Sequence, residues 1–326
     1  MENYTAMAVP AGWKTKLNCW LWKDNALSLK NWGKFWYLGL VWGATFLWLK
    51  IAIREVSPLT VNAIRLLISS ATLFLIARIY KVKIPLRERW RSFLFLGIFN
   101  IALPFALITI SEQSITSGMA SILNSTVPFF TFILLPMFVP DETLSPLKVL
   151  GLVIGFIGVV VLVSNDVSDV FKDFQWGALL VLAASLSYAM AAVFARRVTF
   201  GMHPSAQALG QSLFANLALW PLALVLEAPL TMPRLPMTWI SIFWLGIMAT
   251  AIGTTLFYSL LNQAGATRTT LTTYVFPLVG VLLGVLFLNE SVDWRLLAGG
   301  LLVITGVGIV NAHFKGFSWT RKAEQS

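Results

Sequence analysis

The sequence is poor in the side chains that most catalytic and metal-binding sites need. Its 326 residues include two histidines and 14 acidic residues, and its one cysteine, Cys19, excludes an internal disulfide. These residues are dispersed, so they form no cluster that could hold a metal ion or pair a nucleophile with its base. No phosphate-binding pattern of the form GxxxxGK[ST] occurs either. We therefore expect no metal, no cofactor and no ATP-driven pump.

Charged residues are scarce as well, at 12% of the chain, whereas hydrophobic residues make up 57% and the mean hydropathy is +0.77. Soluble proteins carry about twice that share of charge, so we expect a lipid bilayer to surround most of the chain. The formal net charge of +10 does not indicate a nucleic-acid partner. The basic residues lie between apolar blocks and form no separate domain, which is typical of membrane topology signals.

Ten apolar blocks each approach the roughly 20 helical residues that are needed to cross a bilayer. The expected spans are 35–53, 59–80, 92–112, 117–138, 146–164, 176–195, 206–227, 238–262, 267–288 and 294–313. The weakest boundary is the sequence Ser-Glu-Gln-Ser at 111–114, between the third and fourth spans. The expected fold is an all-α integral membrane protein with ten transmembrane helices.

Lysine and arginine are distributed unequally between the two sides of this arrangement. With the N-terminus inside, eighteen of the 24 basic residues fall in inner segments, while four fall in outer segments and Lys50 and Arg65 lie within spans. The positive-inside rule then predicts a multi-pass protein of the inner cell membrane with both termini in the cytoplasm. Residues 1–33 form a basic, tryptophan-rich tail without a signal peptide, either a helix on the inner leaflet or a disordered leader.

The second half of the chain repeats the landmarks of the first half, in order. The pairs are Pro58 and Pro204, Gly97 and Gly246, Pro128 and Pro277, Glu142 and Glu290, Gly151 and Gly299, and Gly158 and Gly306, at offsets of 146 to 149. Five spans per half is an odd number, so the second copy crosses the membrane in the opposite sense to the first. This predicts inverted five-helix repeats at 34–165 and 174–313, followed by a cytoplasmic tail at 314–326.

Several stretches resemble the drug/metabolite transporter superfamily, in particular its EamA-type domains. The strongest is SEQSITSGMASILNSTVPF at 111–129, and others are WGATF at 42–46, DETL at 141–144 and the glycine-rich segments 151–158 and 299–308. The resemblance covers about residues 36–312. It implies ten helices, a central cavity lined by helices 1–4 and 6–9, peripheral helices 5 and 10, and export of small metabolites from the cytoplasm.

The fourth and ninth spans present matching polar stripes. Ser117, Ser121, Asn124 and Pro128 are spaced so that they share one helical face, and the offset of 149 relates the last three to Thr270, Thr273 and Pro277. Their hydroxyl and amide groups are candidates for substrate binding, although such residues also pack helices together. Pro128 and Pro277 are hinge candidates, with fixed kinks as the alternative.

Six further residues are candidates for substrate binding. Arg65 lies about 10 Å into the second span, and a charge there costs about 2.5–3.5 kcal/mol or more, so it should face a cavity or a partner. Alternatively, its long side chain reaches the outer interface. The equivalent position in the second half is Gln211. The remaining candidates are Trp42 and Tyr188, as cavity walls or packing residues, and the weaker polar positions Asn100 and Tyr258.

Acidic residues fall at helix ends and not near the middle of any span. Proton relays usually use a buried carboxylate or histidine, so transport is either facilitative or coupled by an end-of-helix acid such as Glu112. The leading hypothesis is a secondary transporter that exports amino acids or related organic solutes by alternating access. Its expected partners are a small-molecule substrate and the bilayer, and the glycine faces pack helices within the monomer or in a homodimer. An integral-membrane enzyme and a passive channel are the alternatives.

Overall fold

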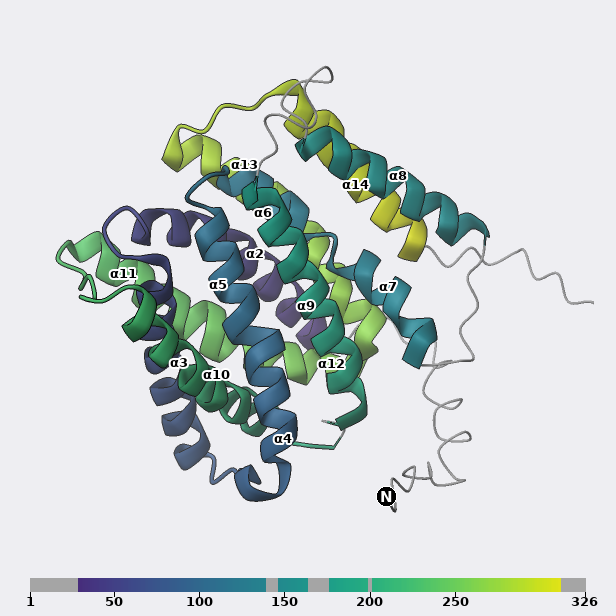
Figure 1. The fold of residues 1–326 in the computed structure, drawn as a ribbon. Coiled ribbons are helices and arrows are strands. Elements are labelled where there is room, and N and C mark those ends of the chain that lie inside the picture. The colour runs from purple at the N-terminus through teal and green to yellow at the C-terminus, as the bar shows by residue number, and fades with distance from the viewer. Residues whose placement is uncertain (1–28, 139–145, 164–175, 199–200, 312–326) are drawn as a thin grey trace, which may run out of the picture.

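The computed structural model describes residues 29–138, 146–163, 176–198 and 201–311 of the chain. Within these residues the regular structure is entirely helical (Figure 1). The first half contains α2 (Leu29–Ala52), α3 (Pro58–Ile79), α4 (Leu86–Gly97), η1 (Ile98–Ala102), α5 (Leu103–Ser111), α6 (Ser117–Asn124), α7 (Val127–Phe138) and α8 (Pro146–Val163). The second half contains α9 (Trp176–Val198), α10 (Pro204–Leu226), α11 (Pro236–Trp244), η2 (Leu245–Ile252), α12 (Gly253–Thr270), η3 (Leu271–Tyr274), α13 (Val275–Leu288) and α14 (Trp294–Asn311).

Six helical segments of the described chain are long and apolar enough to cross a membrane. They are Leu29–Ala52, Pro58–Ile79, Leu86–Ser111, Trp176–Ala195, Pro204–Leu226 and Pro236–Gln263. Three shorter apolar stretches are Val149–Val161, Thr272–Leu288 and Trp294–Gly306. A chain with this many apolar helices is expected to cross the membrane several times. The exact number of ten spans stays a prediction.

Three expected boundaries differ from the structure. Helix α2 begins at Leu29 instead of residue 35, and α4 begins at Leu86 instead of residue 92. Lysine and arginine are good helix formers, so each helix continues past the end of its apolar block. The sequence Gln-Ala-Gly-Ala at 263–266, which was expected to separate two spans, lies inside α12. One glycine costs a helix only about 1 kcal/mol, and no proline interrupts this stretch.

Two prolines coincide with breaks at equivalent points of the two halves. Helix α6 ends at Asn124 and α7 begins at Val127, whereas α12 gives way to the 3-10 turn η3 just before α13. Proline has no N–H, so Pro128 and Pro277 cannot bond to the carbonyl groups of Asn124 and Thr273, four residues earlier. Both prolines therefore lie next to a helix break, and whether these breaks are hinges or fixed kinks stays a prediction.

Each half also contains a π-helical segment, which directly follows the third helix of that half (α4 or α11). Segment η1 directly follows Gly97, and η2 contains Gly246, the residue that corresponds to Gly97 in the repeat. A π-turn widens the helix by one residue and often occurs at functional sites. No residue pattern in the sequence indicates these segments.

Glycines bring the halves into close contact at the centre of the bundle. A Cβ atom on Gly97 would lie 2.8 Å from the backbone oxygen of Gln211 in α10. A Cβ atom on Gly246 would lie 3.0 Å from the backbone oxygen of Arg65 in α3. Arg65 and Gln211 are equivalent in the repeat, so the two contacts are reciprocal.

Helices α8 and α14 lie side by side at the edge of the bundle (Figure 1). Their contact is reciprocal too, because Gly158 packs against the backbone oxygen of Gly299 and Gly306 packs against that of Gly151. Phe156 on α8 and Leu301 on α14 are exposed, at 61% and 67%. Exposed apolar side chains of this size are what a lipid-facing surface requires.

Candidate functional site

Three of the predicted site residues form one hydrogen-bonded cluster between the halves. The Oε1 atom of Gln211 in α10 accepts hydrogen bonds from Asn100 Nδ2 in η1 (3.0 Å) and from Tyr258 OH in α12 (3.1 Å). Gln211 and Tyr258 are fully buried. The Gln211 Nε2 atom is also buried but has no hydrogen-bond partner in the described structure. A buried donor without a partner is costly, so this amide is suited to bind a solute oxygen.

Arg65 lies beside this centre and is only 3% exposed. Its Nε donates to Thr250 Oγ1 in η2 at 2.8 Å, and its guanidinium carbon lies 3.9 Å from the centre of the Phe105 ring. Arg65 also interacts electrostatically with Tyr188 and Glu112. The side chain therefore points into the protein, which contradicts the alternative that it extends to the membrane interface. Its cation–π contact on Phe105 partly offsets the loss of hydration.

The two aromatic candidates lie close to the same region. Trp42 donates from Nε1 to the backbone oxygen of Ala249 at 2.8 Å, and its ring contacts those of Phe257 and Phe276. Ala249 belongs to η2, where the π-helical geometry changes the backbone hydrogen-bonding pattern. Tyr188 packs against the same buried cluster as Trp42. Both aromatic residues have partners in this structure, and whether they also form the wall of a substrate path stays a prediction.

The residues of the two polar stripes do not share one set of partners. Ser117 donates to Glu290 Oε2 at 2.9 Å, and Ser121 donates to the backbone oxygen of Gly118 at 2.7 Å while its side chain lies against Gly280 in α13. These serines therefore take part in helix packing, the alternative considered for the stripe. Asn124 is 7% exposed and its Oδ1 is 3.5 Å from Ser185 Oγ in α9. Thr273 is buried, and the side chain of Thr270 lies outside the described part of the structure.

Three glutamates tie the halves together at one end of the bundle, which we call the capped end. It consists of the connections 53–57, 112–116, 227–235 and 289–293. Glu227 accepts hydrogen bonds from the backbone N–H groups of Leu59 (2.9 Å) and Thr60 (2.8 Å), at the start of α3. A carboxylate at a helix N-terminus satisfies free N–H groups and complements the helix dipole.

The other two carboxylates act in the same way. Glu290 accepts from the backbone N–H groups of Ser117 (2.8 Å) and Gly118 (3.2 Å), at the start of α6. Glu55 accepts from the N–H of Arg234 at 2.7 Å, just before α11. Each cap joins one half of the chain to the other.

Sequence reasoning located these acids at helix ends but missed what they bind. The recurrence of Glu142 as Glu290 marked the position, but the partner helix belongs to the other half and cannot be read from local spacing. Thr250, the partner of Arg65, was also missed, because its role depends on the π-helical turn in η2.

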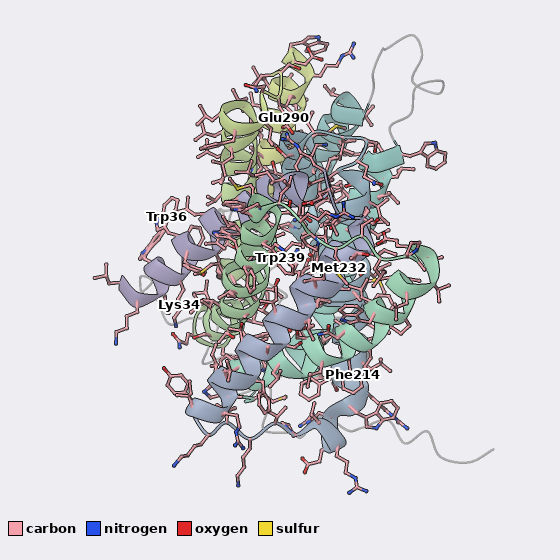
Figure 2. The ribbon with its side chains drawn as sticks, turned by 90° about the vertical axis from the view of Figure 1, so that its left-hand side faces the viewer. Lys34, Trp36, Phe214, Met232, Trp239 and Glu290 are labelled. Carbon is pink, nitrogen blue, oxygen red and sulfur yellow. The ribbon has the colours of Figure 1, made fainter. Side chains whose placement is uncertain are left out.

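The opposite part of α2 carries Lys34, whose Nζ donates to Ser259 Oγ and Gln263 Oε1 of α12, both at 2.9 Å. Figure 2 shows Lys34 and Glu290 well apart in the bundle, with Trp36 on the same projecting end of α2 as Lys34. Lys34 is thus a further link between the halves, remote from the capped end.

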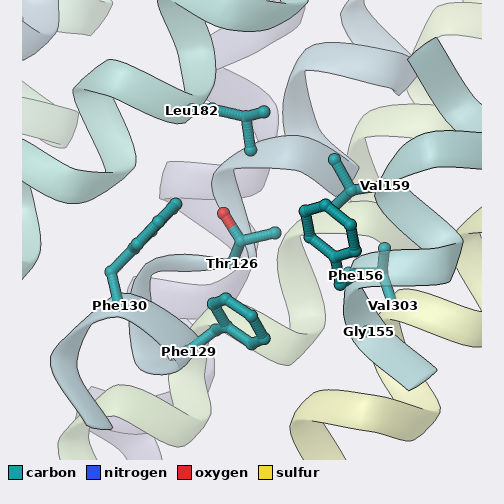
Figure 3. Close-up of a pocket in the computed structure, with 8 residues that line it drawn as sticks. All are labelled: Thr126, Phe129, Phe130, Gly155, Phe156, Val159, Leu182 and Val303. Atoms are coloured by element: carbon teal, nitrogen blue, oxygen red, sulfur yellow. The ribbon is translucent and has the colours of Figure 1, made fainter. Parts of the chain in front are cut away.

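An apolar cavity of about 140 Å³ lies between α7, α8, α9 and α14 (Figure 3). Thr126 is the only polar residue among those that line it, and Phe129, Phe130 and Phe156 form much of its wall. It contains none of the predicted site residues. Its apolar lining offers almost nothing to replace the water around a polar solute.

Comparisons with known proteins agree with one another. The model of the EamA-like transporter family matches residues 31–164 and 175–312. The uncharacterized transporter YoaV of Bacillus subtilis is 26% identical over 276 residues, 82% of this chain and 92% of its own. The uncharacterized inner membrane transporter YedA of Escherichia coli K12 is 28% identical over 282 residues, 84% of this chain and 89% of its own.

A third relative has a more specific description. The probable amino-acid metabolite efflux pump of Escherichia coli K12 is 27% identical over 313 residues, 92% of this chain and 97% of its own. A protein of known crystal structure aligns with a TM-score of 0.63 at 18% identity, covering 87% of this chain and 98% of the other. That alignment supports the fold alone. No group of histidine, cysteine and acidic side chains suited to a metal ion occurs among the described residues.

Proposed function

This chain belongs to the EamA-like transporter family, and on that premise we propose that it exports amino acids or related small organic solutes by alternating access. It is a multi-pass membrane protein, as its apolar helices and its inner-membrane relatives indicate. The family and the names of its relatives indicate a transporter. Transport class, substrate and direction are parts of the proposal.

Reciprocal contacts support two inverted five-helix repeats, and with them ten spans with both termini in the cytoplasm. Gly97 meets Gln211 as Gly246 meets Arg65, and Gly158 meets Gly299 as Gly306 meets Gly151. Inverted repeats allow one sequence to adopt two related conformations, each open to a different side of the membrane. The kinks at Pro128 and Pro277 supply matched points at which the halves can bend.

The observation that carries the proposal is the cluster of Asn100, Gln211 and Tyr258 between the halves. It contains neutral donors and acceptors from three helical segments and one amide nitrogen without a partner. A transported solute must replace its water with such groups and still be released, which neutral groups permit. Arg65 adds a guanidinium nearby, and a guanidinium can bind a carboxylate through two parallel N–H groups. Amino acids fit both features.

Counterflow in proteoliposomes tests this function. The purified protein is reconstituted, unlabelled amino acids are loaded inside, and uptake of each labelled compound is followed. We expect saturable exchange of at least one amino acid. Gln211→Leu should reduce that exchange by about tenfold or more, since it leaves Asn100 and Tyr258 without an acceptor.

Gln113→Leu is the matched control, because Gln113 is an exposed amide in the connection between α5 and α6. It should exchange like the unmodified protein. Flux that does not saturate would favour a channel instead. Equal exchange by the Gln211 and Gln113 variants would remove the cluster from the transport path.

A further inference from the structure

Glu112, at the C-terminal end of α5, is a buried acid without a hydrogen-bond partner. Its side chain is 0% exposed, and neither Oε1 nor Oε2 has a hydrogen-bond partner in the described structure. An ionised carboxylate in such a place loses its hydration and receives no donor in exchange. The protonated acid avoids most of that penalty.

The charged groups around Glu112 are already engaged elsewhere. Lys50 in α2, Arg65 in α3 and Glu290 after α13 are the charged residues that interact with it electrostatically. Lys50 Nζ donates to the backbone oxygens of Glu112 and Ile115, the latter at 2.8 Å, and not to the carboxyl group. The ammonium group therefore caps the end of α5 in the manner typical of a basic residue at a helix C-terminus.

The side chains of Arg65 and Glu290 are also hydrogen-bonded to groups other than the Glu112 carboxyl. Arg65 donates to Thr250, and Glu290 accepts from the start of α6. Helix α9 packs against α5 and contributes Tyr188, which faces Arg65. Helix α6 contributes no titratable side chain. Lys50 and Arg65 favour a charge on Glu112 and Glu290 opposes it, but none of them is hydrogen-bonded to its carboxyl group.

We propose that Glu112 is a proton-binding site whose occupancy is required for the capped end to close. With the end closed, the carboxyl is dry and holds its proton. With the end open, water reaches it, and the proton leaves to that water. Closure then requires the proton to return, so low pH favours the closed end and high pH favours the open end.

A proton fits this site better than a metal cation. Sodium and similar ions need several oxygen ligands at once, and the ammonium group of Lys50 lies against the same turn. Glu55, Glu227 and Glu290 hold the same end closed by hydrogen bonds as acceptors, whereas Glu112 receives none. The proposal deepens the proposed function, but its first two tests need no substrate.

Infrared spectroscopy provides the first test. In the purified protein at neutral pH we expect the C=O stretch of a protonated carboxylic acid. Glu112→Gln should remove that band, while Glu88→Gln should retain it because Glu88 is an exposed acid in α4. The same band in the Glu112 variant, or no band in the unmodified protein, would overturn the proposal.

Accessibility of a neighbouring buried residue provides the second test. Ser111→Cys is introduced with Cys19→Ser, because Ser111 is fully buried beside Glu112. Its modification by a maleimide in detergent should increase with pH. Glu112→Gln mimics the protonated acid and should reduce that increase by about tenfold. The reason is that pH shifts a two-state equilibrium only as far as the two states differ in proton affinity, and glutamine binds no proton. An equal increase with glutamine in place would overturn the proposal.

Counterflow tests the proton site at Glu112 separately from the proposed transport function. Exchange should decrease at high pH in the unmodified protein and should be pH-independent in Glu112→Gln. Exchange that depends on sodium and not on pH would overturn the proton site. If the unmodified protein exchanges no solute, the transport function fails, and the infrared and labelling results still decide the role of Glu112.

Discussion

The two halves of this protein share a backbone arrangement but differ in the side chains that they place at its centre. Gly97 and Gly246 make equivalent close contacts with the backbones of Gln211 and Arg65. At those equivalent positions one half carries a neutral amide and the other a guanidinium. The repeat therefore preserves the backbone contacts between the halves, while the side chains at the equivalent positions differ.

The capped end shows the same division. Glu227 and Glu290 of the second half cap helices of the first, whereas Glu55 of the first half binds the backbone just before α11 of the second. Both halves place a carboxylate at a helix start of the other half. The number of these capping carboxylates and their burial differ between the halves. Substitutions at these positions can separate the backbone symmetry of the halves from the asymmetry of their side chains.

The largest expected effect is on the shared backbone contacts. Gly97→Ala and Gly246→Ala should each lower the free energy of unfolding by about 1–3 kcal/mol, because the new Cβ meets backbone atoms that cannot move aside. Thermal unfolding in detergent measures this. Gly33→Ala is the control, since nothing lies within 4 Å of its Cβ. Loss of stability from only one of the two central variants would break the proposed equivalence of the halves.

Making the centre symmetric should change selectivity more than stability. Arg65→Gln places an amide at both equivalent positions and removes the guanidinium from Thr250 and Phe105. Counterflow of solutes with a carboxylate should decrease by about tenfold more than that of neutral analogues, as expected for loss of a charge-assisted hydrogen bond. A uniform decrease for both kinds of solute would assign Arg65 a purely structural role.

Removing one cap charge should have a smaller effect. Glu227→Gln and Glu290→Gln keep the side-chain size but lose the charge at the start of α3 or α6, and each should cost about 1 kcal/mol of stability. Amide hydrogen exchange at residues 59–60 or 117–118 should increase in the matching variant only. An increase at both helix starts in either variant would show that the caps open together.

The exposed cap at Glu55 should give the smallest effect, and one that depends on pH. Hydrogen bonds from Thr238 and from the backbone of Arg234 and Leu235 hold the pKa of Glu55 below its ordinary value. A lowered pKa stabilises the fold above the unfolded pKa, and that contribution is lost as the pH decreases through the folded value. The melting-temperature difference between the unmodified protein and Glu55→Gln should therefore decrease on acidification. A difference that grows in acid would contradict this assignment.

The sequence was sufficient to predict the helical fold and the repeat, because apolar block length and landmark spacing are local properties. It selected Pro128 and Pro277 as hinge candidates, with fixed kinks as the alternative, and each lies next to a break in its helix. It also selected Asn100, Gln211 and Tyr258, which the fold brings together, although it did not pair them. Their contact depends on η1, a π-helical segment that no propensity indicates.

Other features depended on contacts between distant segments. Ser117 resembled a substrate ligand by spacing, but Glu290 lies 173 residues away in the chain and binds it. The end of α12 was misplaced because a single glycine does not stop a helix. Local patterns therefore selected candidate positions, while the partner of each position required the three-dimensional structure.

A reversible lock on the capped end tests alternating access most directly. Ser57 Oγ and Thr231 Oγ1 lie 3.0 Å apart across the two halves. Ser57→Cys with Thr231→Cys, in a chain that also carries Cys19→Ser, should form a disulfide upon oxidation. We predict that counterflow stops when the disulfide forms and returns when it is reduced. Full counterflow with the disulfide intact would contradict the account, because the halves would then transport without opening this end.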